Sequence, residues 1–366
     1  MSRAQQTSTV EQNGGGVISP IAGGKNRIIN GDFSVDQRAS GAAKTIVNSG
    51  SSYPGVDRWQ MGVSSSVVAT TQQITSDAPV GFGYSNKITF TTGQSIVSGS
   101  NSIMWQWAEG LTTSDLNWGT ANGQTCTLSF WAKSSVTGNH AVQIYTGYSY
   151  VTTYNITAAN TWQKFSIVIP PLTVGGSKPV DNTASISVGF VWGAGSSLQT
   201  TANTWVNGYY TTVAGAAAPA ATSGATWLIA GVQFEVGSVA TPFSKAGGTV
   251  QGELSLCQRY YYRTPSGTNI FLGSGNAYSG TGAAFLINPP VTMRTTPSSA
   301  VDYGNLVITD NVNTGLSVSL LTLNTSVSNA ASVYLAANVS GATQFREYWL
   351  TAASSGAGYI GFSAEL

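Results

Sequence analysis

The sequence predicts an all-β protein built as a sandwich, and three observations support this prediction. Charged residues make up only 8% of the 366 residues, against roughly 25% in an average soluble domain. The composition holds few strong helix formers and many residues that favour strands. Short segments of alternating polar and apolar residues recur between turns rich in Gly, Asn and Ser, which is typical of a β-sandwich.

Two segments frame the first domain. Residues 27–30 are expected to form a strand, residues 30–32 a turn, and a second strand starts at Phe33, because Asn-Gly is the strongest short turn signal. Residues 227–236 alternate between a mixed and an apolar face, which predicts a half-buried strand. Further strands are expected at 58–63, 66–74, 85–91, 102–109, 126–134, 140–146, 163–169 and 185–192.

The chain divides into four segments. Residues 1–25 are polar and Gly-rich, so we expect a flexible arm that is anchored on a neighbouring protein by Val17, Ile18, Pro20 and Ile21. Residues 26–246 form the first β domain. In the connector, residues 247–265, apolar residues recur at intervals of three and four from Gln251 to Arg263, which predicts a short helix. Residues 266–366 are expected to form a second, smaller β-sandwich.

Ten short motifs follow one another along the chain. They are NRIINGDF (26–33), QR (37–38), DRW (57–59), LSFWAK (128–133), TWQKF (161–165), VQFEVG (232–237), ATPF (240–243), LCQRYYY (256–262), PVTMRTTP (290–297) and FSAEL (362–366). The motifs span nearly the whole chain from Asn26 onward. In this order the motifs resemble those of a family of virion proteins from tailed bacteriophages, which comprises tail-fibre, head-fibre and related appendage proteins.

The resemblance implies that the first domain is a jelly-roll like that of carbohydrate-binding modules. It also implies a homotrimer, attachment to other virion proteins through the arm, and a structural role that needs no catalytic residues. Residues 1–16 lack the apolar segment of a signal peptide, so we expect synthesis in the host cytoplasm, no secretion, and assembly into the virion. We expect no membrane insertion and, with a net charge of +1, no nucleic-acid partner.

Patterns for enzymatic chemistry are not found. His140 is the only histidine and lies in an expected turn, without the context of a nucleophilic triad. A glycan depolymerase needs two carboxylates at a fixed separation, and a pair formed in three dimensions from the 14 acidic residues stays open. We predict no catalytic residues, no cofactor and no metal site. A structural calcium at Asp32 and Glu235, as in jelly-roll sugar-binding modules, is left as an open alternative.

Aromatic residues carry the remaining functional prediction. Flat rings flanked by amides and hydroxyls complement the C–H face and the hydroxyl edge of a sugar. The candidates for glycan binding are Trp105, Trp107, Trp118, Trp205, Tyr209 and Tyr210. Trp105 and Trp107 share one strand face, and burial in the core or an interface is their competing interpretation. For Trp205, Tyr209 and Tyr210 the competing interpretation is a subunit contact.

The sequence thus predicts a bacteriophage virion protein, a fibre or appendage on the tail or head that is attached by its arm. Whether its β modules also adsorb to host glycans is left open. One alternative is a capsid decoration protein without a receptor role. A less favoured alternative is a glycan depolymerase.

Overall fold

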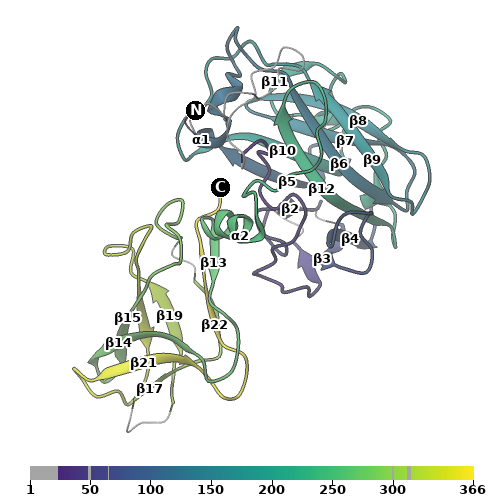
Figure 1. Ribbon diagram of the computed structural model, residues 1–366. Coiled ribbons are helices and arrows are strands. Elements are labelled where there is room, and N and C mark those ends of the chain that lie inside the picture. Colours follow the sequence, from purple (N-terminus) through teal and green to yellow (C-terminus); the bar gives the residue numbers. More distant parts are fainter. Residues whose placement is uncertain (1–23, 48–50, 65, 299–300, 311–314) are drawn as a thin grey trace, which may run out of the picture.

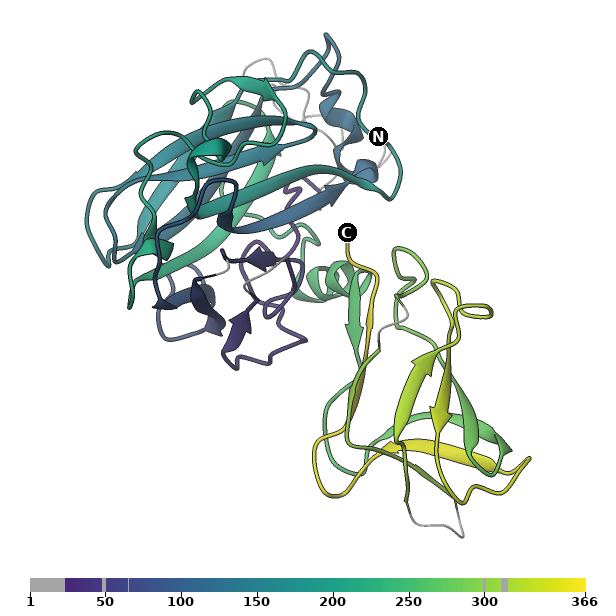
Figure 2. The same ribbon diagram turned by 180° about the vertical axis from the view of Figure 1, so that it is seen from behind.

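The computed structural model describes residues 24–47, 51–64, 66–298, 301–310 and 315–366. The expected arm anchor, Val17, Ile18, Pro20 and Ile21, lies outside these residues. The described chain forms a large jelly-roll sandwich, a short helix and a smaller β domain (Figures 1 and 2), which confirms the predicted fold class. No helix in this part of the chain is long and apolar enough to cross a membrane.

The large sandwich consists of two six-stranded antiparallel sheets. Sheet 1 has the order β1 (Lys44–Ile46), β3 (Val68–Ile74), β4 (Ser85–Thr92), β12 (Thr226–Val236), β6 (Cys126–Ser134), β9 (Gln163–Ile169). Sheet 2 has the order β11 (Trp205–Asn207), β8 (Tyr148–Ile156), β7 (Gly138–Tyr145), β10 (Ala184–Ala194), β5 (Asn101–Glu109), β2 (Gln60–Gly62). Short helical turns lie between strands at α1 (Gly110–Thr113), Ser114–Leu116, Ser196–Leu198 and Pro219–Ala221.

Alternation along the strands builds the core between the two sheets. On β6, Leu128 and Phe130 are fully buried, whereas Trp131 and Lys133 point away and are half-buried. Aromatic rings fill much of the interior, since Trp227 contacts both Trp192 and Phe190. Each fully buried side chain of this size stabilises the fold by about 2–3 kcal/mol.

The first framing segment differs from its prediction, because residues 24–43 contain no strand. Asn30 and Phe33 have positive φ angles of 58° and 59°, which interrupt extended backbone. Side chains bind the backbone here in place of a strand ladder: the N–H of Ile29 donates to Oε1 of Gln106 at 2.8 Å. The segment still lies beside β12, where the N–H of Arg27 donates to the carbonyl of Phe234 at 2.9 Å.

Strands β1, β8 and β11 have no counterpart among the predicted strands, whereas the second framing segment is β12, as predicted. Gly147, with a φ of 82°, forms the tight turn between β7 and β8, and only Gly adopts this conformation readily. Because β7 begins at Gly138, His140 lies in a strand and is fully buried. The expectation of a turn histidine is therefore wrong.

The connector contains the predicted helix, α2 (Val250–Gln258), which is N-capped by the Thr249 side chain. It is shorter than the helical pattern, which runs to Arg263, because Tyr261–Arg263 pairs with the last strand of the chain. A three-stranded sheet follows, with the order β13 (Tyr261–Arg263), β22 (Tyr359–Ser363), β16 (Asp302–Gly304). The second domain is completed by a seven-stranded sheet, with the order β18 (Leu316–Ser317), β17 (Leu306–Thr309), β21 (Glu347–Ala352), β14 (Phe271–Ser279), β15 (Gly282–Ile287), β20 (Val333–Asn338), β19 (Leu320–Leu323).

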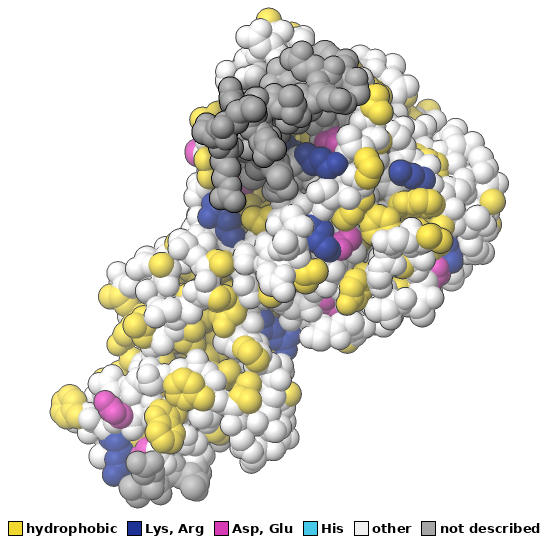
Figure 3. All heavy atoms as spheres, viewed as in Figure 1, with side chains coloured by type: hydrophobic (Ala, Val, Ile, Leu, Met, Phe, Trp, Pro, Cys, Tyr) yellow, Lys and Arg dark blue, Asp and Glu magenta, His cyan; other side chains and the backbone are white. Residues whose placement is uncertain are grey.

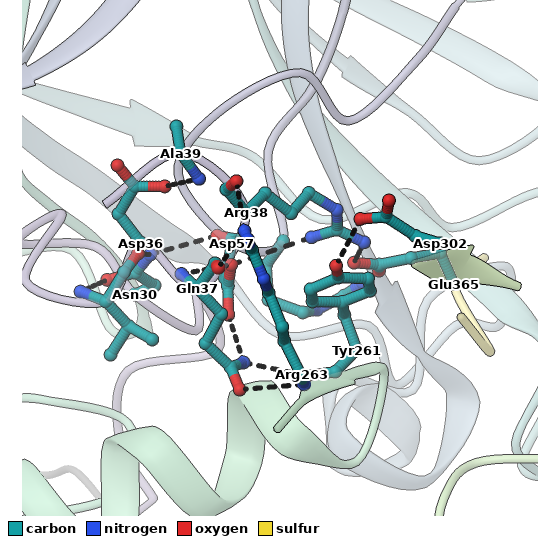
Figure 4. Close-up of polar contacts among 12 residues, drawn as sticks. Asn30, Asp36, Gln37, Arg38, Ala39, Asp57, Tyr261, Arg263, Asp302 and Glu365 are labelled. Atoms are coloured by element: carbon teal, nitrogen blue, oxygen red, sulfur yellow. Dashed lines mark hydrogen bonds and ion pairs between the residues drawn. The ribbon is translucent and has the colours of Figure 1, made fainter. Parts of the chain in front are cut away.

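The two domains meet at a joint formed by α2, β13 and residues 364–366, which lie between them in both views (Figures 1 and 2). Its apolar part packs Cys257 and Tyr260 against Ile29 and Val35 of the first domain. Its polar part centres on Arg38, whose guanidinium stacks on Tyr261 at 3.6 Å and binds Oε1 of Glu365 at 3.0 Å (Figure 4). The joint thus combines apolar packing with charge pairing.

Candidate functional site

Two tryptophans project from the outer face of sheet 2. Along β5, Gln106 and Ala108 are buried, whereas Trp105 and Trp107 are half-buried and point away from the core. Two residues that are two apart in a strand share a side, so both indoles lie on the same face, as predicted. This face holds the candidate site.

The register of sheet 2 leaves space beside these indoles. Trp105 is paired with Gly189 of β10, and Gly189 with Gln143 of β7. Trp107 is paired with Ser187 of β10, which in turn is paired with Tyr145 of β7. Because Gly and Ser occupy the middle strand, the larger residues of β5 and β7 enclose a hollow above β10.

This hollow is a pocket of about 310 Å³, which we call the aromatic pocket. It is lined by Ser51, Gln60, Trp105, Trp107, Gln143, Tyr145, Ser187, Tyr209 and Leu366. The rings form a chain of edge contacts, with centroids 5.9 Å apart for Trp107 and Tyr145 and 5.2 Å apart for Tyr145 and Tyr209. The structure therefore brings three of the predicted residues together, Trp105, Trp107 and Tyr209.

Hydrogen bonds hold the polar groups of the pocket in place. Nε2 of Gln60 donates to Oγ of Ser51 at 2.8 Å. Nε2 of Gln143 donates to the carbonyl of Tyr210 at 2.5 Å, and Nδ2 of Asn101 donates to the hydroxyl of Tyr209 at 3.1 Å. Amides and hydroxyls both donate and accept hydrogen bonds, so the pocket combines ring faces with groups that can bind the hydroxyls of a ligand.

Tyr210 helps to cover the rest of the same face. With Val213 and Ala216 it packs on an outer cluster that includes Ile103 and Val191. The segment 208–218 therefore closes one end of the face, and the aromatic pocket is the part left open. Tyr210 positions Gln143 through its carbonyl and does not line the pocket.

Two of the predicted residues lie elsewhere. Trp118 is only 2% exposed and donates its indole N–H to the carbonyl of Gln124 at 2.7 Å. Its ring faces are therefore closed to a sugar, and Trp118 does not belong to the candidate site. Trp205 lies on β11, with its ring against Trp118 and Tyr150. It seals the edge of the core and is separate from the aromatic pocket.

The residues considered for calcium do not fit such a site. The carboxylate of Asp32 pairs with the ammonium of Lys245. Glu235 accepts hydrogen bonds from the N–H and the hydroxyl of Thr241 at 2.9 and 2.6 Å. The positive charge of Lys245 beside Asp32 opposes the binding of a calcium ion there. Within the described chain, no cluster of three or more His, Cys, Asp or Glu side chains could hold a metal.

Acidic groups come together at the joint and not at the pocket. Asp57 and Glu365 both contact Arg38, at 3.6 and 3.0 Å, and both side chains are at most 5% exposed. Burial raises the pKa of Asp57 to about 6, although Arg38 opposes this effect. Among the described residues that line the aromatic pocket, none is Asp or Glu. The carboxylates of Asp57 and Glu365 are thus buried and paired with arginine side chains.

No protein-family model and no curated protein matches the chain. Solved structures do match. The enzymatically active domain of bacteriophage CBA120 tailspike protein 4 aligns at 14% identity and a TM-score of 0.29, over 58% of this chain and 21% of the tailspike chain. The module TmCBM61, solved with β-1,4-galactotriose, aligns at 10% identity and a TM-score of 0.28, over 58% of this chain and 99% of the module.

A family 11 carbohydrate-binding module from Clostridium thermocellum, solved with a mixed-linked tetrasaccharide, aligns at 12% identity and a TM-score of 0.28, over 57% of this chain and 99% of the module. The structures similar to this chain thus include carbohydrate-binding modules and a phage tailspike domain. TM-scores this low assign neither a ligand nor a role to the chain.

Proposed function

We propose that this chain is a non-catalytic carbohydrate-binding appendage protein of a tailed bacteriophage, and that it binds glycans in the aromatic pocket. The observation that carries this proposal is the position of Trp105 and Trp107 beside Gln143 and Ser187 on an open sheet face. Sugars offer C–H faces that pack on rings and hydroxyls that bind amides, so this surface matches both parts of the ligand.

The chemistry of the pocket favours a neutral glycan. Among the described residues that line it, no side chain is ionised at pH 7, since they are Trp, Tyr, Gln, Ser and Leu. Ring stacking and neutral hydrogen bonds respond little to ionic strength, whereas recognition of an anionic sugar relies on charge that salt screens. We therefore expect binding of neutral oligosaccharides that changes little between low and high salt.

The experiment that tests this proposal is binding of the labelled protein to a glycan array and to host cells, followed by titration calorimetry with the best ligand. Trp107→Ala should weaken binding by about 2 kcal/mol, which is about thirtyfold, because it removes one ring wall. Trp131→Ala is the matched control, since Trp131 is half-buried on the outer face of sheet 1. Equal affinity of Trp107→Ala and wild type would contradict the proposal.

The virion role rests on the ordered motifs from Asn26 onward, and attachment through residues 1–25 and a trimeric state belong to the same proposal. Antibodies against the protein should label purified virions. A version that lacks residues 1–25 should keep glycan binding and lose incorporation into the particle. Loss of glycan binding on removal of the arm would contradict this division of roles.

A structural or decoration role is the second candidate, and one observation favours it. The outer face of the seven-stranded sheet exposes Trp349, Leu286 and Phe271 at 48%, 50% and 62%, and hydrophobic side chains are visible over the smaller domain (Figure 3). Exposed apolar patches often mark contacts between proteins. Virion labelling without binding to any glycan or cell would favour this role, and cleavage of a bound glycan would favour a depolymerase.

A further inference from the structure

We infer that Leu366, in the segment 364–366 that follows the last strand of the second domain, forms a wall of the aromatic pocket and sets its affinity. The inference rests on the proposed glycan-binding function and goes beyond it, because it makes the pocket a product of both domains. Leu366 follows β22, whereas the other described residues that line the pocket lie on strands of the large sandwich or in the loops between them.

Leu366 is held from two sides. Its side chain packs against the apolar part of the joint, which includes Tyr260 and Cys257. Its carbonyl accepts a hydrogen bond from the hydroxyl of Tyr53 at 2.8 Å. A side chain with these contacts has a defined position at the rim of the pocket.

The preceding residues fix the path of the chain toward the pocket. The N–H of Ala364 donates to the carbonyl of Tyr260 at 2.7 Å. Nε and Nη2 of Arg294 donate to the carbonyls of Ala364 and Glu365, each at 2.7 Å. Three successive residues of this segment thus have backbone partners on other elements, which is unusual support for a surface segment.

Glu365 connects this segment to the ring wall of the pocket. Its carboxylate pairs with Arg58 and with Arg38. The guanidinium of Arg58 also donates to the carbonyl of Trp107 at 2.7 Å and stacks on Tyr260 at 3.4 Å. One buried arginine therefore contacts the strand that carries Trp107, the connector and the segment that carries Leu366.

This geometry assigns different roles to the two side chains. Leu366 is a contact residue whose side chain offers no hydrogen bond, so the part of the sugar that faces this side chain presents C–H groups. Glu365 is a positioning residue, which acts on the ligand through Leu366. Docking of the second domain on the first is then required for full affinity.

The test is titration calorimetry with the neutral oligosaccharide that binds the wild-type protein best. Leu366→Ala should weaken binding roughly tenfold with only a small decrease in Tm, because the side chain is partly buried against the joint. Leu320→Ala is the matched control, because Leu320 is 45% exposed on the second domain and does not line the pocket. Unchanged affinity of Leu366→Ala, with Trp107→Ala still impaired, would overturn this inference and leave the proposed function standing.

A double-mutant cycle tests the positioning role of Glu365. Glu365→Gln should weaken binding in the wild-type background and have little further effect in the Leu366→Ala background, because a residue that acts through another gives non-additive changes. Full additivity would overturn the positioning role even if Glu365→Gln lowers Tm. A wild-type protein that binds no glycan would overturn both the inference and the proposed function.

Discussion

Single buried charges hold the joint together, and each has partners far away in the sequence. Arg58 is 1% exposed, yet it pairs with Glu365 and stacks on Tyr260. A buried charge without such partners would be strongly destabilising. The same applies to Asp57, which is bound by Arg38 and by the side chain of Gln37 (Figure 4). Because Asp57 is a buried titratable group, the free energy of unfolding should depend on pH.

Asp57 gives a specific pH prediction. Burial raises its pKa from 3.8 to about 6, so the folded state holds this proton more tightly than the unfolded chain. Its contribution to stability is complete below about pH 4 and is lost as the pH rises through about 6. As the pH rises from about 4 to above 6, the loss of this contribution should lower the free energy of unfolding of the wild-type protein by about 2–3 kcal/mol.

Urea unfolding between pH 4 and 7 checks this prediction. Asp57→Asn removes the titrating group and keeps its shape, so the variant should show a flatter pH profile than wild type. Asp36→Asn is a control, because Asp36 is a partly buried acid that binds local backbone groups of Ala39 and Gly41. Identical pH profiles for wild type and Asp57→Asn would contradict the assignment.

Among the elements, the contact between the opening segment and β12 decides how the first domain closes. The N–H of Val232 donates to the carbonyl of Gly31 at 2.8 Å. A Cβ added at Gly31 would lie 2.1 Å from the carbonyl oxygen of Val232. The backbone could make room for this Cβ only by breaking the hydrogen bond between Val232 and Gly31.

Gly31→Ala should therefore lower the free energy of unfolding by about 2–4 kcal/mol. Gly83→Ala is the matched control, since a Cβ at Gly83 meets nothing within 4 Å, and it should be neutral or slightly stabilising. Chemical denaturation of the two variants provides the comparison. Equal stability of both would show that the opening segment is not packed as closely as described.

The elements also show what the sequence could predict. The sequence predicted the strands at residues 102–109 and 126–134. It also predicted the shared face of Trp105 and Trp107, because residues that are two apart in a strand lie on the same side. The Asn-Gly signal at residues 30–31 predicted a turn correctly. It could not predict that Gln106 and Glu253 would replace a strand ladder there, since both partners are distant in the sequence.

The candidate site required strand order and register, which a single sequence does not reveal. Gln143 and Ser187 join the tryptophans only because β10 lies between β5 and β7. Leu366 joins them only through the joint. Trp118 and Trp205 had the same composition signal as Trp107, yet one is buried and the other seals the core edge. The sequence alone could not distinguish a tryptophan that lines the pocket from one that packs in the core.

For the molecule as a whole, the two domains have different surfaces and different expected roles. The large sandwich carries the aromatic pocket, and the smaller domain carries the exposed apolar sheet face and supplies residues 364–366. The joint lies between them, and Arg58 connects both domains to the pocket. On this account, glycan binding and domain docking depend on each other.

The most direct test of glycan binding in the aromatic pocket is a crystal structure of the protein with the neutral oligosaccharide that binds it best. We expect a sugar packed on Trp105 and Trp107, hydrogen-bonded to Gln143 or Gln60, with its end against Leu366. A ligand bound elsewhere, with the aromatic pocket empty, would contradict it.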